Sequence, residues 1–299
     1  MKIEDLQEKF KNCTSVKISA DAGDLPFIHV KNKSASAQIC IQGAHVMHYQ
    51  PEGEKKDILW MCCNSYFEKG KPIRGGIPVC WPWFGPNMDA ENLPAHGFAR
   101  LMFWTLDSIQ EPDENCTILH LSLNDNDFSR KLWNYSFHLE IEIQIGKTLA
   151  VQLISKNTGD KSFLITEALH SYFNIGNIAN VAVKGLESAL YLNKVEGANS
   201  MIKQKGAITF NAEFDSVFSQ CKQPIHIVDT FFNRTITVEK KNSNSTIVWN
   251  PWIAKSKRMP DFTPDSYLTM VCVETANVLS DAIKIEPGKE QSMGMIIHL

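Results

Sequence analysis

The sequence predicts an all-β protein that folds as a large antiparallel β-sandwich or a barrel. Many short runs of alternating apolar and polar residues are separated by turn residues, and no helix–strand alternation of the βαβ kind is visible. The clearest run is Tyr135–Ile145, in which every second residue from Phe137 onward is apolar and the residues between are polar. This alternation indicates a strand with one buried face and one face in water.

Short strands and a few helical turns are expected along the rest of the chain. An amphipathic helix is expected at 3–10 and one or two helical turns at 125–133. Residues 35–49 suit a hairpin that turns at Gln42-Gly43, and residues 149–153 suit an antiparallel partner of the clearest strand. The other expected strands lie at 16–30 (two strands), 57–61, 101–106, 116–123, 163–175, 181–183, 189–192, 225–228, 235–238, 246–249, 267–274 and 293–298.

The stretch Arg74–Arg100 breaks this pattern with the sequence RGGIPVCWPWFGPNMDAENLPAHGFAR. Frequent Gly and Pro argue against a long helix or a central strand. Its Trp, Phe and Ile side chains are nevertheless too apolar for a disordered linker. We interpret it as a long packed loop with an arginine at each end. Ordered loops of this length are usually functional, although such a loop can also simply cover one end of a core.

The composition is that of an ordinary globular protein, with 43% hydrophobic and 21% charged residues in 299. No shift in composition marks a boundary, so we expect a single domain over residues 1–299. The net charge of −3 comes without a basic stripe, which argues against nucleic acid or an anionic membrane as a partner. An anionic ligand would therefore have to be bound by a few placed arginines.

Several features favour a cytoplasmic protein. The N-terminal segment is charged from its second residue and lacks the apolar core of a signal peptide. No apolar run approaches the length of a membrane span. The eight cysteines are scattered without a C-x-x-C pair, which is typical of reduced thiols rather than of a disulfide framework. Nothing in the sequence requires a second subunit, and a monomer is expected.

Two polar side chains occupy positions where the alternation predicts apolar ones. Glu274 shares a strand face with Met270 and Cys272, and a buried carboxylate is costly unless it is paired or used. The alternative is that Glu274 already lies in water at the end of the strand. His170 shares a face with Tyr172 in an apolar run. A single buried histidine is more often a hydrogen-bonded core residue than a catalyst.

Metal binding and nucleophilic catalysis find little support in the sequence. His96 and His170 could converge in space, but neither has a carboxylate or cysteine at helical ligand spacing, and no metal is expected. Cys80 lies among apolar residues with no group nearby that would form a thiolate. The chain also lacks a G-x-S-x-G sequence, a P-loop and a dinucleotide-binding fingerprint.

The two arginines that flank the loop are candidates for anion binding. Arg74 precedes Gly75-Gly76, and backbone amides beside a guanidinium can approach one anion together. Arg100 closes the sequence His-Gly-Phe-Ala-Arg. The alternative is that both are ordinary surface arginines of a loop.

Four segments together resemble a known family, and they follow in the order Arg74–Gly85, Pro94–Arg100, Leu169–Asn174 and Val273–Thr275. In sequence and approximate spacing they resemble the glucose-6-phosphate 1-epimerases, a branch of the aldose 1-epimerase superfamily. The resemblance runs from about Gln38 to the C-terminus. It implies a large antiparallel β-sandwich of the galactose mutarotase-like type with a few short helices, in agreement with the alternation.

The resemblance also implies roles for individual residues. The catalytic acid would be His170 and the base Glu274, the sugar phosphate would be held by Arg74 and Arg100, and the sugar site would be lined by His96 and Asp215. Some members carry Gln where this chain has Ala95, so a sugar contact made by that glutamine would be missing here.

The implied reaction interconverts the α and β anomers of a hexose 6-phosphate through the open aldehyde. One base takes the proton of the C1 hydroxyl and one acid protonates the ring oxygen, so neither a metal nor a nucleotide is needed. Two alternatives stay open. One is a mutarotase for unphosphorylated aldoses, and the other is a non-catalytic carbohydrate-binding β-sandwich in which Trp81, Trp83, Trp249 and Trp252 stack on sugar faces. A metal-dependent sugar isomerase of the cupin type is a third, weaker alternative.

Overall fold

Antiparallel sheets form the framework of the computed structural model, which describes residues 2–87, 92–195 and 201–299. Part of the loop Arg74–Arg100 therefore lies outside the described residues. The predicted all-β sandwich is confirmed. The first eight-stranded sheet has the order β13 (Val181–Lys184), β17 (Ile225–Asp229), β18 (Arg234–Lys241), β22 (Glu290–His298), β9 (Leu149–Asn157), β8 (Phe137–Ile145), β7 (Cys116–Asn124) and β6 (Thr105–Asp113).

The second eight-stranded sheet carries the residues discussed below. Its order is β15 (Met201–Lys203), β14 (Leu190–Asn193), β16 (Phe214–Ser219), β19 (Ser245–Asn250), β20 (Met270–Asn277), β11 (Glu167–Leu169) and β5 (Val79–Cys80), with β12 (Tyr172–Asn174) also paired to β20. The smaller sheets comprise β1 (Val16–Ala20), β2 (Pro26–Lys31), β3 (Ala35–Cys40) and β4 (His45–Pro51), and the pair β10 (Phe163–Ile165) and β21 (Ile283–Ile285).

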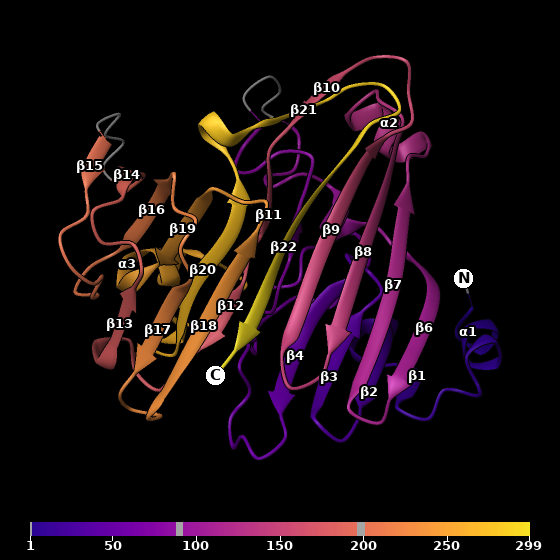
Figure 1. The fold of residues 1–299 in the computed structure, drawn as a ribbon, viewed down its shortest axis with the longest axis horizontal. Coiled ribbons are helices and arrows are strands. Elements are labelled where there is room, and N and C mark those ends of the chain that lie inside the picture. The colour runs from indigo at the N-terminus through magenta and orange to yellow at the C-terminus, as the bar shows by residue number, and fades with distance from the viewer. Residues whose placement is uncertain (1, 88–91, 196–200) are drawn as a thin grey trace.

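Helices are short and peripheral (Figure 1). The α-helices of the described residues are α1 (Ile3–Lys9), α2 (Asp127–Leu132) and α3 (Trp252–Arg258). Asn126 caps α2 in a capping box with Ser129, which explains why this polar stretch is helical. None of the helices in the described part of the chain is long and apolar enough to cross a membrane.

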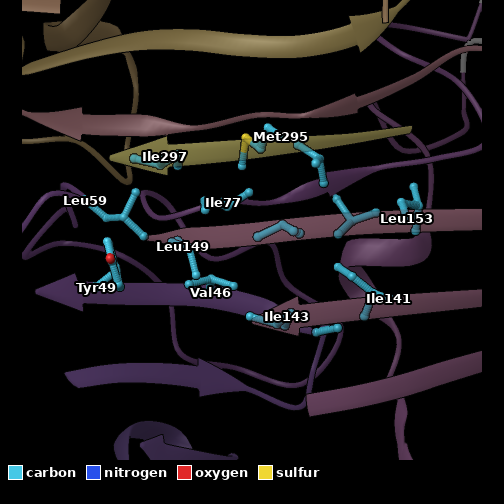
Figure 2. Close-up of a cluster of buried hydrophobic side chains, with 14 of the residues drawn as sticks. Val46, Tyr49, Leu59, Ile77, Ile141, Ile143, Leu149, Leu153, Met295 and Ile297 are labelled. Carbon is cyan, nitrogen blue, oxygen red and sulfur yellow. The ribbon is translucent and has the colours of Figure 1, made fainter. Parts of the chain in front are cut away.

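The main core lies between the first sheet and the sheets behind it. The apolar residues of β8 are buried at every second position, as the alternation predicts. In Figure 2, Ile143 of β8 and Leu149 of β9 lie near Val46 of β4. Each fully buried aliphatic side chain contributes about 1.5 to 3 kcal/mol relative to exposure. Because this one core extends from Leu6 to Ile297, we propose that residues 1–299 form a single domain.

The strand predictions hold best where alternation is regular. The hairpin at 35–49, the helix at 3–10 and the helical turns at 125–133 are confirmed by β3–β4, α1 and α2. The strand expected at 163–175 is instead divided into the three short strands β10, β11 and β12. The strand expected at 101–106 begins only at Thr105, because residues 99–101 form a 3₁₀ turn. Residues 57–61 form isolated bridges rather than a strand. The strands β5, β15, β16 and β21 and the helix α3 were not predicted from the sequence; β5 lies within the stretch interpreted as a loop.

The paired glycines after Arg74 pack closely against the backbone of other segments. The Gly76 N–H donates to the Trp60 carbonyl at 2.8 Å, and Gly75 bridges to Met61. The Gly76 amide is therefore bonded within the fold and is not available to an anion. A Cβ on Gly76 would lie 2.3 Å from the Val46 carbonyl oxygen. The backbone φ of Gly76 is +60°, a conformation that favours glycine. Gly76 allows the chain to pass close to β4, and Gly75 allows a close approach to Trp60 and Met61.

Glu167 of β11 is a buried carboxyl group within the second sheet, with 1% of its surface exposed. It accepts hydrogen bonds from Asn277 Nδ2 at 3.0 Å and Ser155 Oγ at 3.3 Å. Burial raises its pKa from 4.5 to about 7, although both hydrogen bonds act in the opposite direction. The folded state therefore holds this proton more tightly than the unfolded chain does.

This shift predicts that the protein becomes less stable as the pH rises. The stabilisation from the proton on Glu167 is complete below pH 4.5 and is lost as the pH passes through about 7. Between pH 5 and pH 8 the group should lower the free energy of unfolding by up to about 3 kcal/mol. Denaturant unfolding of wild type and Glu167→Gln at both pH values measures it. Between pH 5 and pH 8 the free energy of unfolding should fall less in Glu167→Gln than in the wild type. An equal fall in both proteins would show that Glu167 is not the group responsible.

Candidate active site

The second sheet turns alternate residues of the same strands to opposite sides. On β20, Val271 and Val273 lie in the main core, whereas Cys272 and Glu274 point to the other face. On β19, Val248 faces the main core in the same way. The site is therefore built on the face of this sheet that is turned away from the main core.

Strand register places the predicted Asp215 and Glu274 in neighbouring rows on that face. Asp215 of β16 lies opposite Trp249 of β19, which lies opposite Cys272 of β20. In the next row, Ile247 of β19 lies opposite Glu274. Cross-strand neighbours in such rows have Cβ atoms about 5 Å apart, so the register alone brings these side chains together.

His170 reaches the same face because the chain kinks between β11 and β12. The Ser171 N–H donates back to the Leu169 carbonyl at 2.9 Å, and the His170 N–H donates to the Pro78 carbonyl at 3.0 Å. The imidazole then stacks on the Tyr172 ring, with 4.7 Å between the centroids and 9° between the planes. The kink explains why the predicted long strand is divided, and the stacking fixes the orientation of the His170 ring.

His170 and Glu274 form a close buried pair. Nε2 of His170 lies 3.4 Å from Oε1 of Glu274, and the residues are 7% and 1% exposed. The alternative reading of Glu274 as a solvated residue at a strand end is therefore wrong. Nδ1 of His170 and Oε2 of Glu274 are buried without a hydrogen-bond partner among the described residues. Buried polar atoms without a partner are uncommon in folded proteins and indicate a place where a ligand completes the site.

Burial drives both groups of the pair towards their neutral forms. The pKa of Glu274 lies well above its ordinary value because burial and the negative charge of Asp215 both disfavour the carboxylate. The pKa of His170 lies well below its ordinary value because of burial, and the positive charges of Arg74 and Arg100 lower it further. Burial therefore disfavours the charged form of each member of the pair.

His96 sits in the long loop beside His170, with 5.7 Å between the ring centroids. The predicted convergence of these two histidines is confirmed. The Gly85 N–H donates to Nδ1 of His96 at 3.3 Å, so Nε2 carries the hydrogen of the neutral ring. Burial lowers the pKa of His96 to about 3, and Arg100 and Arg74 add to the effect. His96 is therefore a neutral hydrogen-bond donor at physiological pH.

The two predicted arginines differ in what surrounds them. The Arg74 guanidinium contacts Asp261 at 2.9 and 3.0 Å and donates to the Tyr172 hydroxyl at 2.9 Å, so Asp261 offsets its charge. Arg100 donates to the Ala95 carbonyl at 2.7 Å, a contact that does not depend on the side chain at position 95. No carboxylate of the described residues forms an ion pair with Arg100, and its Nε is buried without a partner there. Arg100 is thus the more available of the two.

A lysine that sequence reasoning left unassigned also enters the site. Lys255 of α3 lies 3.1 Å from Glu213 and 3.4 Å from Asp215, and its Nζ lies 5.7 Å from the centre of the Trp249 ring. Residues 252–258 contain three basic residues, Lys255, Lys257 and Arg258, and show no strand-like alternation, so only a helical interpretation of this segment could have found Lys255. Burial raises the pKa of Asp215, and Lys255 opposes that rise.

The tryptophans expected to stack on sugar divide into two groups. Trp83 and Trp249 line the cavity. Trp81 is completely buried against Phe137, with ring centroids 4.6 Å apart, and Trp252 packs on Tyr267. The prediction that Trp81 stacks on a sugar is therefore wrong, because Trp81 is a core residue. Trp252 is the first residue of α3 and packs against Tyr267.

All six predicted site residues surround one cavity of about 850 Å³. Its volume is in the range of small-molecule sites, and its lining mixes apolar and aromatic groups with a few charged ones. The charged and titratable side chains of its lining are Arg74, His96, Arg100, His170, Lys194, Asp215, Lys255 and Glu274.

This arrangement suits proton transfer at a sugar ring. The C1 hydroxyl oxygen and the ring oxygen of an aldose share the atom C1, so an acid and a base that serve them must lie close together. A buried histidine–glutamate pair at the floor of a sugar-sized cavity meets that need and defines an aldose mutarotase type of β-sandwich. The family model described as aldose 1-epimerase matches residues 26–298, and the chain belongs to this family.

Known proteins agree with this assignment. A curated protein of Escherichia coli named "Putative glucose-6-phosphate 1-epimerase" is 39% identical over 276 residues, 92% of this chain and 91% of that protein. The solved structure of a "putative mutarotase (YeaD)" from Salmonella typhimurium superposes with a TM-score of 0.88 at 35% identity, covering 96% of this chain and 94% of that one. A galactose mutarotase-like protein from Lactobacillus casei shares the fold, with a TM-score of 0.68 at 14% identity over 91% of this chain and 99% of that one.

The comparisons bear on both fold and activity. The predicted galactose mutarotase-like β-sandwich is confirmed by these neighbours. Membership of the aldose 1-epimerase family makes the chain an isomerase whose substrate is a small-molecule sugar.

Proposed function

We propose that this enzyme interconverts the α and β anomers of hexose 6-phosphates, with glucose 6-phosphate as the principal substrate. The buried His170–Glu274 pair in the cavity is the observation that carries the chemistry. The names of relatives such as the Escherichia coli protein support a phosphorylated substrate. So does the basic side of the cavity, where Arg100 has a charge that no described carboxylate pairs with.

In this mechanism Glu274 is the base and His170 is the acid. Glu274 takes the proton from the C1 hydroxyl while His170 protonates the ring oxygen, the bond from C1 to the ring oxygen breaks and a C1 carbonyl forms. Rotation about the C1–C2 bond followed by the reverse proton transfers closes the ring to the other anomer. Each positioned proton transfer typically contributes about 10² to 10⁴-fold in rate.

The number of protons on the pair is the same before and after ring opening. Before opening, the proton is on His170 and Glu274 is ionised; after opening, Glu274 is protonated and His170 is neutral. Burial favours the second distribution, so it favours the state that accompanies the open-chain sugar. The first distribution needs help, and a phosphate dianion that offsets the charges of Arg74 and Arg100 would make the protonated His170 less costly.

The remaining candidates position the sugar. We propose that Arg100 binds the phosphate, with Arg74 contributing its free N–H groups while Asp261 balances its charge. His96 would donate from Nε2 to a sugar oxygen, and Asp215 would accept from a hydroxyl while Lys255 holds it in place. Interactions with a remote, non-reacting group orient C1 at the acid/base pair.

We further propose a cytoplasmic monomer. All six candidate residues come from one chain, and all eight cysteines are free, as expected in a reducing compartment.

The wild-type enzyme should accelerate the α-to-β conversion of glucose 6-phosphate well above the spontaneous rate. Polarimetry or proton exchange spectroscopy measures this, with glucose and galactose in parallel at equal concentration. We expect the phosphorylated sugar to have the highest kcat/KM, because only it engages Arg100. Activity on galactose alone would keep the acid/base chemistry and overturn the phosphate site. A lack of activity on every sugar would favour a carbohydrate-binding domain.

A further inference from the structure

Cys272 lies next to the acid/base pair although the proposed reaction does not use it. The described group with metal-ligand chemistry comprises His170, Cys272 and Glu274, whose donor atoms all lie within 4.8 Å of one another. All three side chains are buried. Sequence spacing did not indicate this group, because His170 lies about a hundred residues before the other two.

The fold holds the three donors in place. Cys272 and Glu274 are two residues apart on β20 and therefore project from the same face of the strand. Tyr172 lies directly opposite Cys272 in the pairing of β12 with β20, and the His170 ring stacks on Tyr172. The three donors thus come from two hydrogen-bonded segments in the sheet and not from flexible loops.

The donor set suits a tetrahedral zinc ion. Zinc binds nitrogen and oxygen at about 2.0 to 2.2 Å and thiolate sulfur at about 2.3 Å, so neighbouring donors in a tetrahedral site lie about 3.3 to 3.8 Å apart. The His170–Glu274 separation of 3.4 Å already meets this range. Oε2 of Glu274 is also without a partner among the described residues.

We propose that His170, Cys272 and Glu274 form an inhibitory site for Zn²⁺ in this isomerase. The thiol proton leaves to solvent as the zinc–sulfur bond forms, and the fourth ligand position faces the cavity, which His170 and Glu274 line. Zinc would inhibit because it occupies both members of the pair that move the protons. Thiolate and imidazole ligands favour Zn²⁺ over Mg²⁺, which prefers oxygen ligands.

Inhibition rests on the proposed function, whereas metal binding does not, so the test measures both. The full-length wild type, Cys272→Ala, Cys272→Ser and Cys63→Ser would be compared. Cys63 is an exposed free cysteine and serves as the matched control for adventitious thiol binding. Mutarotase rates would be recorded against Zn²⁺, with Mg²⁺ as the control ion and a chelator to reverse the effect. Titration with Cd²⁺ reports a metal–thiolate bond through its ultraviolet charge-transfer band.

Wild type and Cys63→Ser should be inhibited reversibly by Zn²⁺ and not by Mg²⁺. Both Cys272 variants should keep their activity but need at least about 100-fold more Zn²⁺ for the same inhibition, since even outer partners of metal ligands contribute about 10- to 100-fold in affinity. In the Cys272 variants, the intensity of the Cd²⁺ charge-transfer band should fall by the amount that corresponds to one metal–thiolate bond. Equal zinc sensitivity of the Cys272 variants and the wild type would overturn the proposal, as would an unchanged Cd²⁺ band. If no mutarotase activity is found, the Cd²⁺ titration still decides whether the metal binds.

Discussion

Replacing Glu274 with glutamine is expected to lower kcat for glucose 6-phosphate by about 10² to 10⁴-fold, down towards the spontaneous rate. The amide keeps the size of the side chain but cannot accept the proton of the C1 hydroxyl. Polarimetry or proton exchange spectroscopy, corrected for the spontaneous reaction, measures the loss. His170→Ala should lose a similar factor. The double variant should be little worse than either single variant, because an acid and a base that act as a unit are strongly non-additive.

The same variant should leave the protein folded and at least as stable as the wild type. Burial raises the pKa of Glu274, so ionisation of this residue in the unfolded chain favours unfolding at neutral pH. Glutamine removes that penalty while resembling the protonated acid. A gain in stability above pH 7 together with a loss of activity would identify Glu274 as a residue retained for chemistry rather than for folding.

Glu167→Gln is the matched control for this experiment. It makes the same chemical change at another buried carboxyl group of the same sheet, on the adjacent strand β11. Its kcat should stay within a few-fold of the wild type. Full activity in Glu274→Gln, or equal losses in both glutamine variants, would contradict the role of Glu274 as base.

Arg100→Gln is expected to separate phosphorylated from free sugars. Removing one partner of a buried, charge-assisted contact typically costs about 2 to 5 kcal/mol, which corresponds to about 30- to 5,000-fold in kcat/KM for glucose 6-phosphate. Free glucose and galactose, which lack the phosphate, should lose much less. Steady-state kinetics on the three sugars measures the difference. Arg100→Lys should recover part of the loss, because lysine keeps the charge without the planar pair of donors.

The control for this change is Arg130→Gln. Arg130 pairs with Asp125 at α2, away from the residues that line the cavity, so its loss should affect all three sugars little. If Arg100→Gln lowers activity on free and phosphorylated sugars equally, Arg100 does not recognise phosphate. Arg74 would then be the next candidate, although Asp261 already offsets its charge.

The sequence could predict the elements in which local pattern and burial agree. Strand β8 alternates without interruption, so its period of two is visible in any window, and its buried positions are those expected. The hairpin β3–β4 was visible for the same reason. Strand β16 was missed because its sequence, Phe-Asp-Ser-Val-Phe-Ser, places two polar residues in succession and so does not alternate cleanly. The strand at 163–175 was predicted as continuous because the Ser171–Leu169 hydrogen bond that divides it leaves no mark in composition.

Candidate site residues were visible in the sequence to different degrees. Glu274 and His170 stood out because a polar residue on an apolar strand face is costly, and family resemblance then suggested roles for them. Lys255 and Cys272 were missed because nothing local distinguishes them: a lysine in a short helix and a cysteine in an apolar strand are both ordinary. The packing role of the paired glycines was not visible, because it depends on which backbone lies opposite: β4 for Gly76 and residues 60–61 for Gly75.

By itself the sequence determined the all-β architecture, the main strands and the two polar residues on apolar faces, because these follow from interactions along one chain segment. Only the tertiary structure decided that His170 and Glu274 meet at 3.4 Å, that Asp261 neutralises Arg74 while Arg100 has no such partner among the described residues, and that Cys272 joins the pair. The physical reason is that these contacts depend on strand register and on a kink between β11 and β12. Both are set by pairing between residues far apart in the chain.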